Sequence, residues 1–313
     1  MLKFVVKRIV TAIVILLVSM FAVFTLLTYI PGSRLGYMNI MGNGDLLDHI
    51  FEVLKVQPSL ISRYLRYVYD VFVHFHFASG FRHHDLNAEI LSRTRFTLLL
   101  TLAGFVFIVV IGIPVGTMSA RKKGSLFDRA VSVCSMFLAS IPPFCLAIYL
   151  AMIFCLWLRL LPVFGFKELR NFILPTITIA SSALANTIQT CRFAIIEELN
   201  KPYVKYLRTS GRKETAILFG HALRNAMLPV ISVIKEMTAS IFVSTFIAEW
   251  FYAIPGIGYY LIQGINSRDY GVIMASTMVI AIVIIVFNIV SDVLYSCFDP
   301  KLRNAEIRGE QNV

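Results

Sequence analysis

The organisation of this chain is decided by residues 197–229, which read EELNKPYVKYLRTSGRKETAILFGHALRNAMLP. This stretch is basic and compatible with helix, and it lies between two strongly apolar segments. Charged side chains inside a bilayer cost about 2.5–3.5 kcal/mol each on insertion scales, so such a stretch belongs outside the hydrocarbon. On the cytoplasmic side of a membrane protein, a loop of this length and composition is suited to binding a soluble partner.

The composition is that of a protein built mostly inside a membrane. Hydrophobic residues make up 58% of the 313 residues and charged residues only 15%, whereas soluble domains are about 45–50% apolar and about 25% charged. The net charge of +11 is explained by basic loops beside membrane spans, which fix topology, rather than by nucleic-acid binding. We therefore predict an all-α polytopic membrane protein.

Six segments are long and apolar enough to cross about 30 Å of hydrocarbon as helices. They are Ile9–Ile30, Phe96–Ala120, Ala130–Leu158, Phe172–Cys191, Pro229–Ala248 and Tyr270–Ser291. The first has 22 residues, more than the apolar region of about 7–15 residues in a cleaved signal peptide, so we expect a retained span. Glycine and proline predict kinks in the second and third spans, at Gly104, Gly112, Pro114, Gly116, Pro142 and Pro143.

The distribution of lysine and arginine predicts that both termini lie in the cytoplasm. In this orientation the cytoplasmic segments carry 17 of these residues and the external segments 11, as the positive-inside rule requires. Residues 62–77 of the first external loop, SRYLRYVYDVFVHFHF, are aromatic and too charged to span, and an amphipathic segment at the outer interface fits them. The expected division is residues 1–30 (N-terminal region and first span), 31–95 (external loop), 96–298 (five-span core) and 299–313 (cytoplasmic tail).

Within residues 197–229 we expect two short helices separated at Ser210-Gly211. Pro202 suits the first turn of a helix, and Gly211 can adopt a positive φ and end the first helix. Pro229 then fits the start of the fifth span. An apolar stripe at a spacing of three to four residues predicts the face that packs on the other helices: Ala216, Phe219, Leu223 and Met227.

Eight sequence elements occur in a characteristic order along nearly the whole chain. They are LKFVVKRIV…YIPG, SRTRFTLLLTLAGFVFIVVIGIPVGTMSARKKGSLFDR, SIPPF, LPVFGF, RFAIIEEL, Gly211…HALRNAMLP, AEWFYAIPGIGYYL…NSRDY and FDPKLR. Together they resemble the permeases of ABC importers, in the dipeptide, oligopeptide and nickel branch. The element that begins at Gly211 is similar to the cytoplasmic coupling loop of that family.

The resemblance has three departures. Lys205-Tyr206-Leu207 stands where the family has a Glu/Arg-Thr-Ala type of triplet, which concerns the contacts to the ATPase. Gly32-Ser33-Arg34 replaces a Gly-Asp-Pro, and the external domain after the first span is short. The last two departures leave the class of substrate open.

The resemblance implies a type I ABC importer permease fold with six transmembrane helices, in the bacterial inner membrane. It implies as partners a homologous second permease, two cytoplasmic ATPase subunits and an external binding protein that delivers peptides or a peptide-like or metal-chelate solute. The chain contains no GxxxxGK[ST] motif, so ATP and Mg²⁺ are expected at the ATPase subunits and no cofactor on this chain. We expect a permease without catalytic residues.

The resemblance also implies which residues couple the permease to the ATPases: Tyr203, Gly211, Glu214, Leu218, His221, Arg224, Asn225 and Pro229. Gly211 and Pro229 also serve as ordinary helix punctuation, and His221 is expected to be a surface residue rather than a metal ligand. Arg212 and Arg224 either bind the partner or interact with the membrane surface.

Five further polar residues are candidates for the translocation pathway or its gate: Asn186, Gln189, Lys235, Glu236 and Glu249. Asn186 and Gln189 line the pathway or form hydrogen bonds between helices. Lys235 and Glu236 face the pathway or lie near the cytoplasmic headgroups, which we favour slightly. Glu249 either receives the binding protein or is solvated at its helix end.

Neither histidine nor cysteine predicts a metal site. His74, His76, His83 and His84 cluster in the outer loop, but coordination needs more than nearby histidines. None of the five cysteines forms a CxxC pair, and each lies in or beside an apolar segment, where free cysteine behaves as a small hydrophobe.

Two other function classes fit less well. A self-sufficient secondary transporter or channel would often show an internal repeat and ionisable relays within its spans, and neither is evident. An intramembrane protease would need a paired nucleophile and base or H-E-x-x-H within its spans, and no such motif occurs.

Overall fold

The computed structural model describes residues 2–29, 60–74, 86–166 and 168–298. Every regular element in this part of the chain is helical. The chain divides into two units. The first comprises Met1–Val5, Leu98–Ile254 and Val286–Val313, and the second comprises Val6–Thr97 and Pro255–Ile285.

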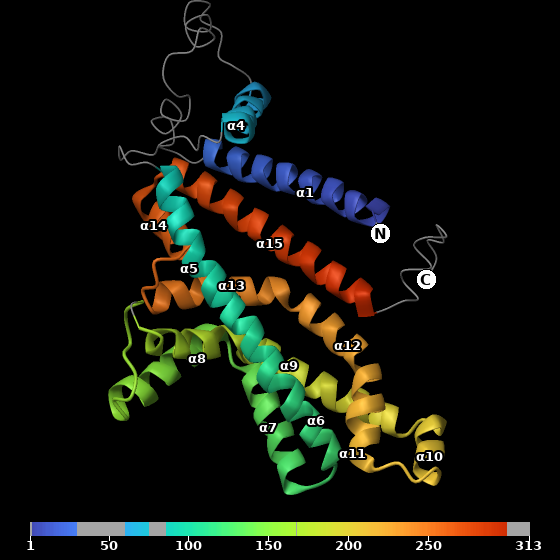
Figure 1. Cartoon of the computed structure of the whole chain (residues 1–313). Helices are drawn as coiled ribbons and strands as arrows, with labels where there is room; N and C mark the ends of the chain where they lie inside the picture. Colours follow the sequence, from blue (N-terminus) through green and yellow to red (C-terminus); the bar gives the residue numbers. More distant parts are fainter. Residues whose placement is uncertain (1, 30–59, 75–85, 167, 299–313) are drawn as a thin grey trace, which may run out of the picture. The chain divides into compact units, whose positions relative to one another are not determined.

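Figure 1 follows the helices along the chain, and three short π-turns between them are designated η1, η2 and η3. They are α1 (Leu2–Tyr29), α4 (Leu60–His74), α5 (Leu86–Phe107), η1 (Ile108–Gly112), α6 (Ile113–Arg121), α7 (Leu126–Ser140), α8 (Pro143–Leu150), η2 (Ala151–Trp157), α9 (Arg170–Leu199), α10 (Pro202–Thr209), α11 (Glu214–Ile217), η3 (Leu218–Ala222), α12 (Leu223–Glu236), α13 (Thr238–Phe251), α14 (Ile257–Ser267) and α15 (Tyr270–Phe298).

Among the described residues, four continuous helical segments are long and apolar enough to cross a membrane: Arg8–Tyr29, Leu86–Arg121, Glu214–Glu236 and Tyr270–Val293. The pair formed by Leu126–Ser140 and Pro143–Trp157 makes a fifth if it is counted as one span, but its two helices are bent by 111°. The prediction of an all-helical polytopic chain is therefore confirmed at the level of four to five candidate spans.

The helices that contain three of the predicted spans differ from them in extent or continuity, and the predicted kink in the third is confirmed. The second segment begins at Leu86, ten residues before Phe96. The third is not one straight helix, because the proline pair that follows Ile141 interrupts it: the residue before a proline is driven out of helical geometry, and Ile141 is extended with ψ 124°. Pro229 does not begin a helix but lies inside α12, and the predicted fifth span is divided at Met237 between α12 and α13.

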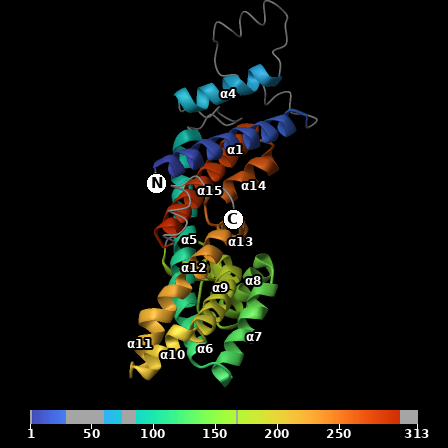
Figure 2. The ribbon, with the colours of Figure 1, turned by 90° about the vertical axis from the view of Figure 1, so that its right-hand side faces the viewer.

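Helix α9 forms the centre of the first unit. It packs against α6, α7, α8, α12 and α13, and Figure 2 shows it enclosed among them. Fourteen of its 30 residues are buried, many of them small, such as Ala180, Ser181 and Ala185. Small residues allow helix backbones to approach closely, which is how helices associate where no water drives them together. This explains why α9 is buried although it is not among the most apolar helices.

The segment from α5 to α6 presents glycines to α9. A Cβ atom added to Gly104 would lie 2.8 Å from the side chain of Ile179, and one added to Gly112 would lie 3.2 Å from Thr187. At Gly116 it would lie 2.8 Å from both Cys191 Cβ and the carbonyl oxygen of Ile188. Gly112 and Gly116 have the G-x-x-x-G spacing of close helix pairs, and here they hold α6 against α9.

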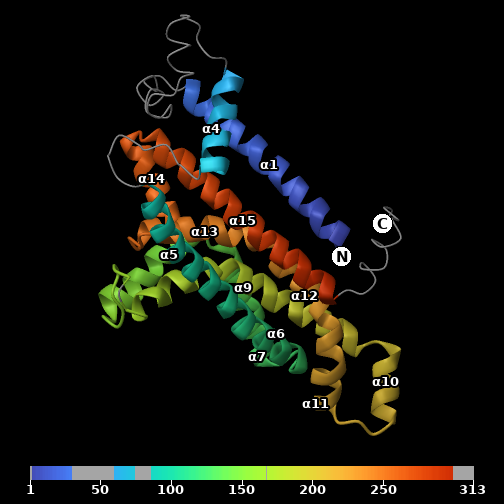
Figure 3. The same ribbon diagram turned by 45° about the horizontal axis from the view of Figure 1, so that its top comes forward.

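The second unit contains the predicted amphipathic segment as helix α4. Tyr64, Tyr67 and Val71 are buried against Leu16, Met20 and Phe24 of α1 and against Met274 and Met278 of α15. The Tyr64 hydroxyl donates a hydrogen bond of 2.6 Å to the carbonyl oxygen of Leu17. Figure 3 shows α4 lying against α1. The helix is confirmed; its place at the outer membrane interface stays a prediction.

The glycine contacts predict that Gly116→Ala destabilises the protein, whereas Gly220→Ala does not. A methyl group at Gly116 meets a backbone oxygen and a Cβ atom, neither of which can move like the end of a side chain, and such overpacking typically costs about 1–3 kcal/mol. A Cβ at Gly220 has nothing within 4 Å, and alanine is the better helix former by about 0.8–1 kcal/mol. Thermal unfolding of the purified variants in detergent measures both effects. Equal melting temperatures would contradict the proposed packing.

Candidate functional site

The candidate site is the stretch from the end of α9 to the middle of α12. It contains the two predicted helical segments on either side of Gly211, namely α10 and the continuous helix that begins with α11. Pro202 is the first residue of α10, and Gly211 has φ +77°. Both predictions are confirmed, because proline is preorganised for the first turn and glycine alone adopts positive φ without steric cost.

An ion pair connects α10 to α11 across Gly211. Arg208 Nε and a second guanidinium nitrogen lie 2.6 and 3.2 Å from the two carboxylate oxygens of Glu214. Both side chains are exposed, with 44% and 65% of their surface accessible, and exposed pairs contribute only about 0–1 kcal/mol. The pair therefore stabilises the turn between α10 and α11 only weakly.

The apolar face of the second helix differs from the predicted stripe. Leu218, Ala226 and Val230 are buried in one cluster with Ala120, Cys191 and Ile195, and Ala222 is buried as well. Ala216 is exposed, and so is Phe219, at 54%. The prediction was confirmed for Leu223 and Met227, which are partly buried against this cluster, and was wrong for Ala216 and Phe219. These two residues lie before and within the π-turn η3, whose extra residue shifts the helix face relative to a regular helical period.

A hydrogen-bonded cluster around Glu198, here called the Glu198 cluster, joins α9, α10 and α12. The Tyr203 hydroxyl donates to Glu198 Oε2 at 2.8 Å. Asn225 Nδ2 donates to the same oxygen at 3.3 Å and to the Tyr203 hydroxyl at 3.2 Å. Lys201 forms an ion pair with Oε1 of Glu198. The structure thus brings the predicted residues Tyr203 and Asn225 together around a buried carboxylate that was not predicted.

The Glu198 cluster keeps its carboxylate ionised. Burial raises the pKa of Glu198, but the hydrogen bonds from Lys201, Tyr203 and Asn225 outweigh it, so the pKa lies below the ordinary value of 4.5. The hydrogen bond to Glu198 in turn raises the pKa of Lys201. At neutral pH the cluster is therefore a paired charge within a partly buried site, and it ties the loop to the end of α9.

The other predicted coupling residues lie in different environments. Leu218 is buried, His221 is half-buried, and Arg224 and Pro229 are exposed. The largest exposed apolar side chains of the stretch are Tyr206, at 71%, and Phe219. Neither was predicted as a site residue, although a large aromatic residue in a basic loop is itself a signal for partner binding.

The two predicted polar residues of α9 differ in their contacts: Asn186 bonds within α9 and to a sulfur atom outside it, whereas Gln189 bonds to α7. Asn186 Nδ2 donates to the carbonyl oxygen of Ser182 at 3.0 Å and lies 3.8 Å from Met237 Sδ. Gln189 Nε2 donates to the carbonyl oxygen of Ser132 at 3.2 Å. These contacts support the interpretation that both residues link helices, and a role in the pathway stays a prediction.

The charged residues beyond the loop are unequal in burial. Lys235 forms an ion pair with Asp292 of α15, whose side chain is 4% exposed. Glu236 is exposed, while Glu249 in α13 is fully buried. Asp292 was not predicted as a site residue, although an acid directly after the uncharged Tyr270–Ser291 segment signals a partner cation.

No group of three or more potential metal ligands occurs among the described residues. His76, His83 and His84 lie outside them, so the prediction that they do not bind metal stays a prediction. Cys134, Cys145, Cys155 and Cys191 are free thiols.

The sequence matches the models of a family of transport proteins. The model of the family described as "Binding-protein-dependent transport system inner membrane component" matches residues 112–304. The model of the corresponding N-terminal region matches residues 1–85. The two matches together include the candidate site and most of the chain.

Three curated proteins are among the similar sequences. The oligopeptide transport system permease protein AppB of Bacillus subtilis (strain 168) is 32% identical over 223 residues, which cover 68% of this chain and 71% of AppB. The dipeptide transport system permease protein DppB of the same organism is 28% identical, with 97% and 98% covered. The metal-staphylopine import system permease protein CntB of Staphylococcus aureus (strain NCTC 8325 / PS 47) is 29% identical, with 97% and 99% covered.

A solved structure has a similar fold. The chain superposes on one chain of the MetNI methionine ABC transporter, in inward-facing conformations, with a TM-score of 0.58. The match covers 70% of this chain and all of that chain, at 16% sequence identity. At this identity the likeness concerns the fold alone.

The Glu198 cluster predicts that Glu198→Gln destabilises the protein by about 1.5–3 kcal/mol, the usual contribution of hydrogen bonds to a charged group. The neighbouring Glu197 is exposed, so Glu197→Gln makes the same change of charge and is expected to have almost no effect. Thermal unfolding in detergent compares the two variants.

The loss of stability caused by Glu198→Gln should also depend on pH, in a direction that follows from the pKa of Glu198. Because the folded pKa of Glu198 is lowered, its contribution is complete above the ordinary value of 4.5 and is lost as the pH falls through the folded pKa. The difference between wild type and Glu198→Gln should therefore shrink in acid.

In a Tyr203→Phe/Asn225→Ala background the effect of Glu198→Gln on stability should also be smaller, and an undiminished effect would show that the cluster does not act as a unit.

Proposed function

We propose that this chain, which belongs to the family of binding-protein-dependent transport system inner membrane components, forms the translocation pathway for peptides or for a peptide-like or metal-chelate solute. It is a permease of an ABC importer, a multi-pass protein of the inner membrane. The proposed solutes are supported by the transport systems after which its relatives AppB, DppB and CntB are named.

The proposed topology has six spans of the type I importer fold with both termini in the cytoplasm. The spans are α1, the segment Leu86–Arg121, the bent pair of α7 with α8 and η2, α9, α12 with α13, and α15. The divisions at residues 30, 95 and 298 are proposed with it. Helix α9 is included because Gln189 donates a hydrogen bond to α7 and Asn186 bonds within α9 itself, so its polar groups are satisfied as a place inside a bundle requires.

By length and composition alone, the helix Glu214–Glu236 could also cross a membrane from its first residue. We place its first half in the cytoplasm instead. Arg224 and Asn225 are exposed there, and the resemblance of residues 211–229 to a coupling loop favours the same side. The membrane-crossing part then begins near Pro229.

The proposed partners are a homologous second permease, two cytoplasmic ATPase subunits that bind ATP and Mg²⁺, and an external binding protein. One observation carries this proposal: two large aromatic side chains, Tyr206 and Phe219, are exposed on a loop that is itself fixed to the bundle. Such side chains are the usual anchors of a protein interface. The predicted residues Tyr203, Asn225 and Leu218 act behind this surface by holding the loop, and Gly211, Glu214, His221, Arg224 and Pro229 shape it or face the partner.

The mechanism follows from the rigidity of this attachment. When the ATPases change conformation, they can shift the docked loop only if the free energy of their contacts with it differs between the two conformations of the permease. The loop passes the movement to α9 through the Glu198 cluster and through the buried face of Leu218, Ala222 and Ala226. Rearrangement of the helices then opens the pathway to alternate sides.

The proposed pathway and gate residues have different roles. Lys235 and Asp292 pair their charges between α12 and α15, which makes them suited to holding one arrangement of these helices. Asn186 and Gln189 link α9 to its neighbours, and Glu236 and Glu249 stay candidates for the pathway and for the reception of the binding protein. A secondary transporter that works alone is disfavoured by the family of the chain.

The test is a mild-detergent purification of the tagged chain with mass spectrometry of the proteins retained, followed by transport in liposomes. Wild type should retain a second permease and a P-loop ATPase. Phe219→Ser should lose the ATPase, because serine removes the apolar anchor. Leu126→Ser removes an even more exposed apolar side chain, 84% accessible against 54% for Phe219, outside the loop, and this variant should retain the ATPase.

Two results would contradict the proposal. The first is a wild-type chain that purifies alone and moves solute without ATP. The second is a Phe219→Ser variant that keeps the ATPase and transports as wild type does. This result would show that the loop is not the docking surface.

A further inference from the structure

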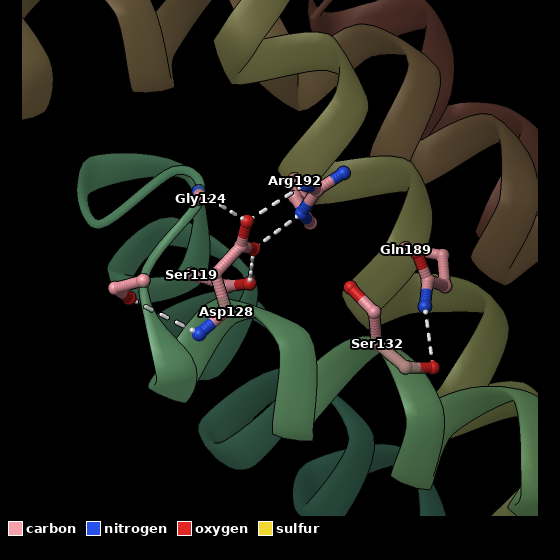
Figure 4. A network of polar contacts seen from close by, with 7 residues as sticks. Ser119, Gly124, Asp128, Ser132, Gln189 and Arg192 are labelled. Carbon is pink, nitrogen blue, oxygen red and sulfur yellow. Dashed lines mark hydrogen bonds and ion pairs between the residues drawn. The ribbon is translucent and has the colours of Figure 1, made fainter.

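Asp128, in the first turn of α7, is a buried carboxylate surrounded by four donors (Figure 4). Only 3% of the residue is exposed. Ser119 Oγ donates to Oδ1 at 2.6 Å and the backbone N–H of Gly124 donates to Oδ2 at 2.8 Å. Arg192 of α9 donates from Nε to Oδ1 at 2.6 Å and from a terminal nitrogen to Oδ2 at 2.9 Å. The two-pronged geometry is the strongest that an arginine makes with a carboxylate.

The sequence KKGSLFD builds the turn that aims this carboxylate. Gly124 has φ +83° and turns the chain after α6. Ser125 caps α7 by accepting a hydrogen bond of 3.3 Å from the N–H of Asp128. Ser125 and Asp128 have the spacing of a capping box, and an acid near a helix N-terminus is favoured by the helix dipole. Arg192, more than sixty residues away in the sequence, then completes the site.

A second contact joins the same faces of the same two helices. Gln189 Nε2 donates to the carbonyl oxygen of Ser132 at 3.2 Å, as Figure 4 also shows. Gln189 and Arg192 are three residues apart on α9, and Asp128 and Ser132 are four apart on α7, so each pair shares a helix face. Helix α7 is therefore attached to α9 at two successive points and cannot slide along it without breaking an ion pair.

Arg192 and Glu198 are six residues apart on one continuous helix, a rise of about 9 Å. Arg192 binds the turn between α6 and α7, and Glu198 binds α10 and α12. One short piece of α9 thus holds both the 119–128 turn and the candidate coupling loop. Both contacts are charged, and both lie within the first unit.

We propose that Asp128 and Arg192 are positioning residues of the transport cycle. They make the 119–128 turn, and with it the start of α7, move together with α9 when the coupling loop is displaced. This inference rests on the proposed function, since it needs ATPases that act on the coupling loop. Without the pair, the ATPases still dock and hydrolyse ATP, but α7 no longer follows α9 and less solute moves for each ATP.

The experiment uses the complete complex with its binding protein in liposomes and measures solute moved per ATP hydrolysed. Asp128→Asn keeps the size of the side chain and one acceptor oxygen, for either Ser119 or Gly124, but it loses the charge that binds Arg192. Arg192→Met removes the other partner. We expect both variants to retain the ATPase subunits and to lower the transport-to-hydrolysis ratio roughly 5-fold or more, the lower end of typical coupling factors.

Arg129→Met is the matched control, because Arg129 is an exposed cation beside Asp128 and its loss changes the local charge alone. It should leave the ratio unchanged. Arg192→Lys keeps the charge without the two-pronged geometry and should recover part of the ratio that Arg192→Met loses. This graded recovery is not expected if the pair only stabilises the fold.

The proposal is overturned if Asp128→Asn and Arg192→Met leave the ratio unchanged, or if they lower transport and hydrolysis in equal proportion. Should either variant fail to assemble, Arg192→Lys decides by the same ratio, and a wild-type value overturns the proposal. A wild-type chain that binds no ATPase would refute the proposed function itself, whereas a coupled wild type with an equally coupled Asp128→Asn refutes only this inference.

Discussion

The close approach of α6 to α9 is the constraint on which the first unit depends. Gly116 brings the two backbones so near that a single Cβ would meet the carbonyl oxygen of Ile188 at 2.8 Å. This approach places Cys191 and Ile195 of α9 beside Ala120, at the end of α6, and it creates the cluster into which Leu218 and Ala226 of the loop pack. The position of the coupling loop is therefore set by glycines about a hundred residues earlier in the chain.

Polar contacts gather where the helices of this unit end. Among the described residues, ion pairs hold the buried acids Asp128, Glu198 and Asp292, with Arg192, Lys201 and Lys235 as their partners. In the pair of Asp128 with Arg192 both side chains are largely buried, and removing one partner of such a pair typically costs about 3–5 kcal/mol. Because each pair joins two different segments, these contacts specify which helices stay together when the bundle rearranges, more than they add to its stability.

The sequence predicts the parts of this structure that depend on local chemistry. Hydropathy locates the helices, and Pro202 and Gly211 locate the break within the loop. Pro142 and Pro143 predict a kink, but its size, 111°, depends on packing that no local rule contains. The π-turn at Leu218–Ala222 displaced the predicted apolar face, and the partners of Asp128, Glu198 and Asp292 were missed. Two of these acids, Asp128 and Asp292, pair with residues far away in the sequence, so only the folded chain identifies their partners.

The contacts within the loop are weak and those behind it are strong. This difference would allow one loop both to bind a partner and to transmit its movement, as the proposed function requires. Between α10 and α11 the chain is held by one exposed ion pair, Arg208 with Glu214, beside a glycine of positive φ. This turn can adapt to the surface that it meets at little cost, because exposed pairs contribute little. Behind it, the Glu198 cluster and the Asp128–Arg192 pair are buried and resist displacement. In the proposed transport cycle, a movement imposed on the loop would therefore be passed to α9 and α7 rather than absorbed within the loop.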